Sequence, residues 1–179
     1  MTNKESITIE MSKLARKKKT IFLGENIINS GRIYGTMDRV PLDKCVEMPV
    51  AENLIAGTAI GLAIAGYHPI CIFQRMDFMF IAADAIINHA CMYPKMCPSI
   101  KMKIIFRTIV ADLNNKFFVG YQHSKNLTHV FDPYMEVVNI PDKSARTAYE
   151  IAGKYTSPIL IVESYKDYNK EERRTANGK

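Results

Sequence analysis

Glu52 is the residue in this chain best placed for proton transfer. It is the only charged residue between Met48 and Gln74, a stretch dominated by apolar and small side chains. A carboxylate in such surroundings holds a proton more readily than one in water, which suits general acid–base catalysis. Glu52 also stands at the start of a predicted helix, where a carboxylate complements the helix dipole. Its position alone leaves both interpretations open.

Two other short motifs carry side chains that could take part in chemistry. A Gln-His-Ser motif at 122–124 lies between two predicted strands, and His123 could exchange protons or simply lie at the surface. The run Asp-Phe-Met-Phe at 77–80 could offer an aromatic platform to a cofactor, or Asp77 could cap a helix and the aromatic rings belong to the core. The sequence has no Gly-rich phosphate loop and no metal-ligand spacing of His, Asp and Glu. Taken singly, these residues do not identify an activity.

Short apolar runs alternate with longer helical patterns, and these elements must position the candidate residues. Strands are predicted over Thr20–Gly24, Pro69–Gln74, Met102–Phe106, Glu136–Ile140 and Pro158–Glu163. Helices are predicted over Val50–Ala65, Asp77–Tyr93 and Asp142–Tyr155. Several strands are apolar throughout, as expected for a sheet covered on both faces. We therefore expect an α/β fold, a three-layer sandwich with a mainly parallel central sheet.

The helix boundaries rest on capping and breaking residues. Asp142 is expected to cap the third helix, and Pro94 to end the second. The first helix is rich in Ala and Gly, which predicts a backbone packed closely against another element. Its apolar part, 54–65, is too short to cross a bilayer, so we expect a buried helix followed by a buried strand, and no membrane association.

Charge and cysteine content narrow the class of protein. The chain has 179 residues and a formal net charge of +6. Residues 1–19 carry six basic and two acidic groups, residues 169–179 carry four and two, and the body between them carries fourteen of each. A neutral body argues against nucleic-acid binding. The expected organisation is a basic N-terminal segment (1–19), one domain (20–168) and a flexible tail (169–179). Four cysteines without zinc-finger spacing favour a reduced, cytoplasmic protein without structural zinc.

Several ordered blocks together closely resemble one family. They run over 47–61 (EMPVAENLIAGTAIG), 65–70 (AGYHPI), 76–78 (MDF) and 83–90 (ADAIINHA), and continue through 105–107 (IFR), 122–124 (QHS), 137–138 (VV) and 157–163 (SPILIVE). The chain resembles the pyrimidine-binding domain of thiamine-diphosphate enzymes, specifically the beta subunit of the dehydrogenase component of 2-oxo acid dehydrogenase complexes. The resemblance covers roughly residues 22 to 168.

The resemblance implies roles for four residues. Glu52 occupies the position of the glutamate that hydrogen-bonds a ring nitrogen of the cofactor's aminopyrimidine and favours its imino tautomer. Phe78 matches the aromatic residue that stacks on the aminopyrimidine, and Gln74 falls where a residue flanks that ring. His123 matches the active-site histidine that orients or protonates intermediates. The small residues of the first helix imply packing against a counterpart helix in a second subunit.

Three departures from the family pattern bear on the activity. The family usually has a glutamate where this chain has Ile72. The usual Gly-Pro-x-Gly loop is replaced by Thr108-Ile109-Val110-Ala111, which affects the wall that faces the substrate. The C-terminal domain of the family, which helps assembly and contacts the acyltransferase core, is not matched, so transfer to a lipoyl arm is not implied.

The family also implies a partner chain. Its diphosphate-binding domain holds Mg²⁺ through a Gly-Asp-Gly motif, which this sequence lacks. We therefore expect an alpha-type subunit to bind the diphosphate and Mg²⁺, in an α2β2 heterotetramer. The leading hypothesis is the pyrimidine-binding subunit of a split enzyme that decarboxylates or cleaves a 2-oxo acid or ketose-like donor and transfers the acyl or aldehyde fragment. The alternatives are a split transketolase-like or synthase subunit, and a non-catalytic subunit that stabilises or regulates a partner enzyme.

Overall fold

A parallel six-stranded sheet forms the centre of the molecule. The computed structural model describes residues 1–29, 31–111 and 120–172. The strands are β1 (Thr20–Gly24), β2 (Cys45–Glu47), β3 (His68–Phe73), β4 (Ile105–Val110), β5 (Glu136–Ile140) and β6 (Ile159–Ser164), in the spatial order β2-β1-β3-β4-β6-β5. Every neighbouring pair is parallel. The predicted α/β class is confirmed, with β2 as an additional strand.

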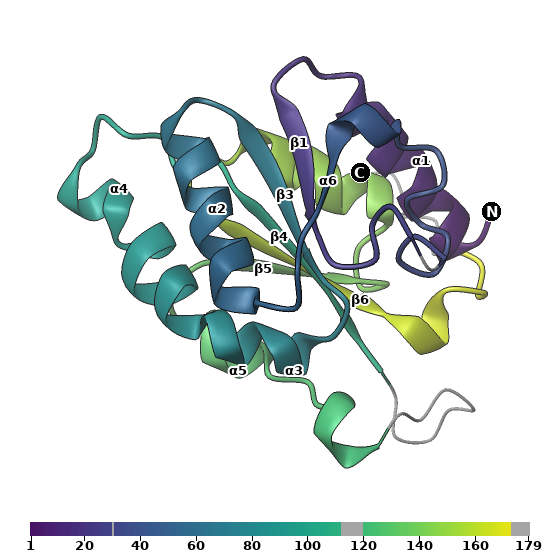
Figure 1. The fold of residues 1–179 in the computed structure, drawn as a ribbon. Helices are drawn as coiled ribbons and strands as arrows, with labels where there is room; N and C mark the ends of the chain where they lie inside the picture. The colour runs from purple at the N-terminus through teal and green to yellow at the C-terminus, as the bar shows by residue number, and fades with distance from the viewer. Residues whose placement is uncertain (30, 112–119, 173–179) are drawn as a thin grey trace, which may run out of the picture.

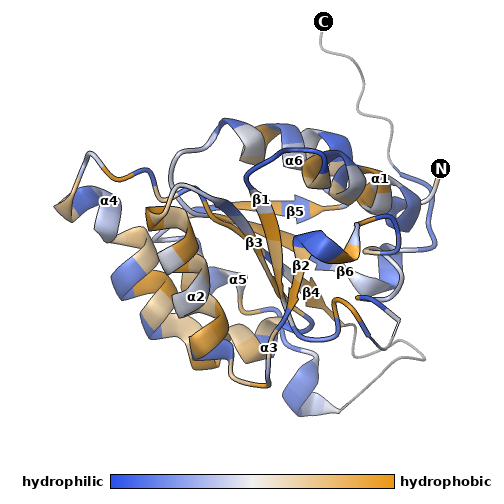
Figure 2. Cartoon of the chain, turned by 45° about the horizontal axis from the view of Figure 1, so that its top comes forward, coloured by the Kyte–Doolittle hydropathy of each residue, from blue (hydrophilic) through white to orange (hydrophobic). Residues whose placement is uncertain are grey.

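Helices cover both faces of this sheet and complete three layers (Figure 1). The helices α1 (Asn3–Ala15) and α6 (Ala145–Lys154) pack on one face, over a core that includes Phe22 and Ile70. On the other face lie α2 (Glu52–Ile64), α3 (Met76–Met79) and α5 (Thr128–Phe131). The central strands are hydrophobic along their length, consistent with burial on both sides (Figure 2). No helix in the described part of the chain is long and apolar enough to cross a membrane.

The N-terminal segment contains a helix that was not among the predicted elements. Thr2 and Glu5 form a capping box, in which the Thr2 side chain accepts from the Glu5 backbone and the Glu5 carboxylate accepts from the Thr2 backbone. This spacing is a known helix-start signal. Ile7 and Met11 of α1 are fully buried against the sheet. Residues 3–15 therefore belong to the folded core.

The helix predicted over 77–93 forms, but it is not one regular α-helix, because its hydrogen-bond register changes along the segment. The segment divides into α3, a 3₁₀ turn (Phe80–Ala82), a π-helix (Ala85–Cys91) and α4 (Tyr93–Met96). Pro94 was expected to end a helix and instead lies in the first turn of α4. A proline is tolerated there because the first N–H groups of a helix have no intrahelical partner.

Two further boundaries differ from prediction. Ser144, and not Asp142, caps α6, since its side chain accepts a hydrogen bond from the Thr147 backbone. The predicted strand at 102–106 is displaced, because β4 begins at Ile105, which pairs with Ile70 of β3. Buried apolar residues precede β4 without joining the ladder, so hydrophobicity alone placed the strand too early.

The expectation that the small-residue helix is buried is only half right. The face of α2 that carries Ile55 and Ala59 is buried, but Leu54 and Ile64 are 52% and 48% exposed. Gly57 lies on the exposed face, and a Cβ built there would meet no atom within 4 Å. An apolar, small-residue face is therefore open to solvent in the single chain.

Gly24 lets β1 and β3 approach each other closely. A Cβ at this position would lie 2.5 Å from the Ile72 carbonyl oxygen, a backbone atom of the neighbouring strand. We expect Gly24→Ala to lower the free energy of unfolding by about 1–3 kcal/mol or more, because the strands must separate. Gly57→Ala is the matched control and should leave stability unchanged or raised. Urea unfolding of both variants measures this, and equal stability of the two would contradict the account.

A buried ion pair joins β4 to β6. Arg107 and Glu163 are both fully buried, and the guanidinium donates two hydrogen bonds to the carboxylate, of 2.6 and 2.8 Å. The hydroxyls of Tyr149 and Tyr168 also donate to Glu163. Burial raises the pKa of both phenols well above its usual value, so they remain protonated donors. Arg107 also donates to Thr36, which ties the loop after β1 to the sheet.

Candidate functional site

The candidate site lies at the carboxyl edge of the sheet, where the strand order changes direction. The chain leaves β1 for β2 on one side and returns through α2 to β3 on the other. In open α/β sheets, ligands bind outside the carboxyl ends of the strands at such a switch point. Glu25 follows β1 here, and Gln74 follows β3. The Gln74 amide donates a 3.3 Å hydrogen bond to the Glu25 carbonyl oxygen, which joins the two strand ends.

Glu52 is the first residue of α2 and is almost completely buried. Its side chain is 6% exposed, and no hydrogen bond or ion pair of its carboxylate is found among the described residues. The carboxylate oxygens are not among the fully enclosed polar atoms that lack a partner, so they keep some contact with solvent, and burial of the residue carries a reduced desolvation cost. The helix N-terminus offsets part of this cost through its dipole. The remaining acceptor capacity suits an N–H donor that comes from outside this chain.

Glu25 is a candidate site residue that sequence reasoning missed. Burial, followed by the charges of Glu52 and Glu47, raises the pKa of the Glu25 carboxyl above its usual value. Negative charges close to a carboxyl group disfavour its ionised form, as burial does. The signal available in the sequence was its position directly after a predicted strand, at the edge where ligands bind.

Glu47, the third carboxylate beside Glu25 and Glu52, has a structural role. Its two carboxylate oxygens accept hydrogen bonds from the backbone N–H groups of Asn26 and Ile28. Asn26 has a positive φ of 55°, a conformation that most residues avoid. Glu47 therefore stabilises the turn that follows Glu25 and fixes where this side chain leaves the sheet.

Phe78 and His123 form a second group. Their ring centroids are 5.3 Å apart with an interplanar angle of 72°, an edge-on contact. The Nδ1 atom of His123 is buried and has no hydrogen-bond partner among the described residues. Asp77 does not cap α3; it accepts from the backbone N–H of Lys125, at 3.3 and 3.4 Å, and so holds the segment after His123 against α3.

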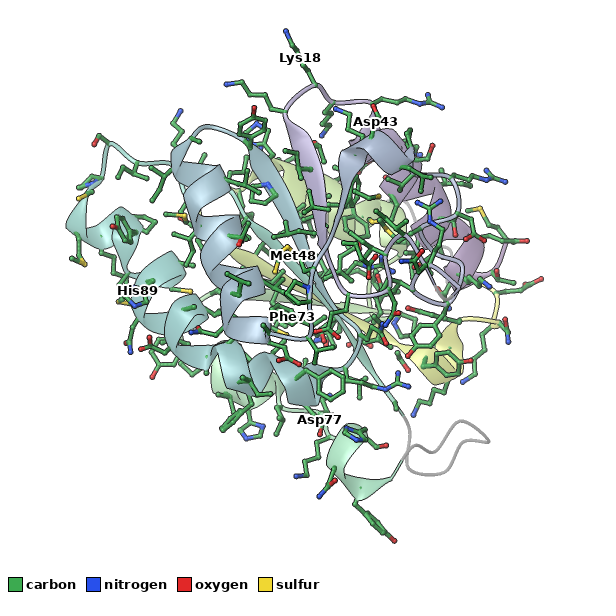
Figure 3. All side chains as sticks on the ribbon, in the orientation of Figure 1. Lys18, Asp43, Met48, Phe73, Asp77 and His89 are labelled. Carbon is green, nitrogen blue, oxygen red and sulfur yellow. The ribbon has the colours of Figure 1, made fainter. Side chains whose placement is uncertain are left out.

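The four predicted site residues thus fall into two pairs. Glu52 and Gln74 share Glu25 as a neighbour, while Phe78 contacts His123. Within residues 1–29, 31–111 and 120–172, no hydrogen bond or ring contact links the pairs directly. They are connected through the short segment from Gln74 to Phe78, which leaves β3 and forms α3 (Figure 3, where the labelled Phe73 and Asp77 each precede one end of the segment).

The raised pKa of Glu25 predicts a pH dependence of stability. A folded-state pKa above the unfolded value of 4.5 means that the folded chain binds more protons, so stability falls as pH rises above 4.5. Glu25→Gln is expected to remove this slope and to stabilise the chain near pH 7. Urea unfolding between pH 4.5 and 7 measures it, with Glu136→Gln, at an exposed carboxylate, as control. An unchanged slope in Glu25→Gln would contradict the prediction.

Comparison with known proteins identifies the family. Residues 1–101, more than half of the chain, match the model of the transketolase pyrimidine-binding domain. The chain belongs to this family. This pyrimidine-binding domain is 31% identical over 177 residues to the mitochondrial pyruvate dehydrogenase E1 component subunit beta of Mus musculus. The alignment covers 92% of this chain and 47% of the relative. The domain is 28% identical over 161 residues to the corresponding subunit of Chaetomium thermophilum, with 84% and 41% covered.

Solved structures confirm the fold of the domain. A split-gene transketolase, described as an inactive beta4 tetramer, superposes with a TM-score of 0.74 at 18% identity, over 100% of this chain and 56% of that one. Transketolase from Campylobacter jejuni gives a TM-score of 0.73 at 13% identity, over 99% and 28%. The pyrimidine-binding domain spans less than half the length of the pyruvate dehydrogenase relatives.

Proposed function

We propose that this chain is the pyrimidine-binding subunit of a split thiamine-diphosphate enzyme that decarboxylates or cleaves a 2-oxo acid or ketose-like donor. The observation that carries the proposal is Glu52, a residue 6% exposed at the start of α2, whose carboxylate has no hydrogen-bond partner among the described residues and keeps some contact with solvent. The aminopyrimidine of thiamine diphosphate offers a ring nitrogen to such a carboxylate. Membership of the pyrimidine-binding family supports this assignment of the cofactor.

The residues at this edge fit the aminopyrimidine chemically. When bound, thiamine diphosphate supplies an electron sink for cleavage of the bond next to a carbonyl group. In the proposal, Glu52 accepts the hydrogen bond of the pyrimidine ring and holds or releases a proton at its carboxylate. Phe78 stacks on the ring, Gln74 flanks it, and His123, which lies against Phe78, orients or protonates the donor. Glu25 places a second carboxyl group near Glu52, and its pKa is raised by burial and by the neighbouring carboxylates.

We also propose that activity requires a partner. An alpha-type subunit would bind the diphosphate and Mg²⁺, in an α2β2 assembly, since the sequence lacks the Gly-Asp-Gly motif for that task. The exposed face of α2, with Gly57 and Leu54, would pack against another subunit. The cytoplasm is the proposed compartment, on the basis of four cysteines that are all free thiols.

Reconstitution with a partner subunit tests the proposed function. The chain, a candidate partner with the Gly-Asp-Gly motif, Mg²⁺ and thiamine diphosphate are mixed, and decarboxylation of a panel of 2-oxo acids and cleavage of ketose phosphates are measured. We expect activity that depends on both chains and on the cofactor. Cleavage of ketose phosphates alone would favour the split transketolase-like alternative. Absence of cofactor dependence in every pairing would contradict the proposal and favour a non-catalytic subunit.

A further inference from the structure

The positive charge of this chain gathers at the amino edge of the sheet, opposite the candidate site. The segments that lead into the six strands are 16–19, 41–44, 65–67, 97–104, 132–135 and 154–158. Together they contain eight Lys or Arg and only two Asp or Glu. Lys18 and Asp77, labelled in Figure 3, mark these two opposite ends. Four of these basic residues belong to the N-terminal segment (16–19), and the body of the chain adds four basic and two acidic groups at the same edge.

A small cavity lies at this edge, between the sheet and the C-terminal ends of α1 and α6. Its volume is about 30 Å³, which is enough for one or two waters or a compact ion but not for an organic ligand. Lys17, His68 and Lys103 line it, and the rest of the lining is Thr20, Gly153 and four apolar residues, Leu14, Pro69, Ile70 and Ile105. No carboxylate lines the cavity. Three nitrogen-bearing side chains, of which Lys17 is also exposed at the surface, therefore border a small space whose other walls are largely apolar.

The hydrogen bonds within the described residues leave donors available in this cavity. Lys103 donates one hydrogen bond, of 3.0 Å, to the Gly153 carbonyl oxygen at the end of α6, which leaves two of its three protons. The Nδ1 atom of His68 has no hydrogen-bond partner among the described residues, but it is enclosed by protein and is not itself open to the cavity. The ammonium of Lys17 forms no hydrogen bond or ion pair with the described residues. The hydrogen bond of Lys103 to the end of α6 is explained by the helix dipole. The dipole does not explain why Lys17 and His68 lie at the same cavity.

The cations also act on one another. Burial, and then the charges of Lys103, Lys19 and Lys17, lowers the pKa of His68 below 6.5. Burial, and then Lys17 and Lys101, lowers the pKa of Lys103. Nothing acidic offsets these repulsions at Lys103. An anion between these side chains would relieve the repulsion and give the free donors acceptors.

We propose that the cavity lined by Lys17, His68 and Lys103 binds a compact oxyanion of the phosphate class, as a free ion or as the terminal group of a larger phosphate ester. Oxyanions of this class offer several acceptor oxygens and up to two negative charges. The site bridges α1, β3, the start of β4 and α6, so its occupation stabilises the packing of one helical layer on the sheet. It is separate from the proposed cofactor site, because it lies at the opposite edge.

Thermal unfolding of the full chain in inorganic phosphate and in chloride, at equal ionic strength and pH 7, tests this site. At phosphate concentrations about tenfold above Kd, we expect Tm to rise by about 3–6 °C more than in chloride. Lys103→Met and Lys17→Met should each weaken phosphate binding about tenfold. Lys143→Met, which removes an exposed lysine near the carboxyl edge, should bind as the wild type does. If Lys103→Met does not fold, Lys17→Met decides the result.

A second readout concerns the His68 ring. Its NMR signals, assigned by comparison with His68→Gln, should titrate at a higher pH in phosphate than in chloride.

Tighter binding of pyrophosphate than of phosphate would assign the site to a phosphate ester, and equal binding to the free ion. Equal stabilisation of wild type, Lys17→Met and Lys143→Met would indicate a general salt effect and overturn the proposal. Equal stabilisation by chloride and phosphate would also overturn it. Neither result bears on the thiamine-diphosphate function.

Discussion

Replacing Glu52 with glutamine is expected to lower thiamine-diphosphate-dependent turnover of the assembled enzyme by 100-fold or more. Glutamine keeps the size of the side chain but cannot hold a negative charge or release a proton at this atom. General acid–base groups contribute about 10²–10⁴-fold to the rate, which sets the scale of the loss. Steady-state decarboxylation of the best donor from the reconstitution panel measures the effect.

The control for this variant must separate chemistry from assembly. Glu52→Gln should still fold and associate with its partner, because the carboxylate makes no hydrogen bond or ion pair with the described residues that the amide would break. Glu136→Gln removes an exposed carboxylate from the start of β5 and should keep full activity. Turnover of Glu52→Gln within twofold of wild type would exclude the assigned role of Glu52.

Arg107→Met is expected to have the largest effect on stability. It leaves the Glu163 carboxylate buried without its charge partner, and such changes cost about 3–5 kcal/mol. For a domain of this size the corresponding fall in Tm is about 6–20 °C. The loop after β1 also loses the hydrogen bond between Arg107 and Thr36, so we expect local opening near Glu25. Thermal and urea unfolding measure the loss, and hydrogen exchange locates it.

A surface pair of the same chemistry provides the control. Arg146 and Glu150 form a 2.8 Å ion pair on α6, with side chains 73% and 55% exposed. Arg146→Met should lower the free energy of unfolding by less than about 1 kcal/mol, since exposed ion pairs contribute little to stability. Replacing both Arg107 and Glu163 with apolar residues should recover part of the loss, because no buried charge remains. If Arg107→Met lowers the free energy of unfolding no more than Arg146→Met does, the stabilising role assigned to the buried Arg107–Glu163 ion pair is wrong.

The sequence was sufficient to predict the parts of the fold and site that depend on local pattern. Apolar runs without alternation predicted a covered parallel sheet, and the structure has one. The isolation of Glu52 among apolar residues predicted a buried carboxylate, and it is 6% exposed. In both cases the burial of a residue follows from the apolar residues next to it in the sequence.

What the sequence did not reveal depends on contacts between distant segments. Glu25 gains its unusual environment from Glu47 and Glu52, which β2 and α2 bring beside it. Ser144 caps α6 in preference to the nearby Asp142, a choice that the composition of the segment does not resolve. The exposed apolar face of α2 has the same composition as a buried one. A prediction of burial from composition therefore cannot separate a core face from an unoccupied interface.

The most direct test of the central claim is the exchange rate of the thiazolium C2 hydrogen of thiamine diphosphate with deuterium, followed by NMR in the assembled enzyme. It needs no knowledge of the donor and reports activation of the cofactor itself. We predict fast exchange with the wild-type chain plus partner, and exchange at least 100-fold slower with Glu52→Gln or with the partner alone. Equal rates in all three samples would show that this chain does not activate the cofactor.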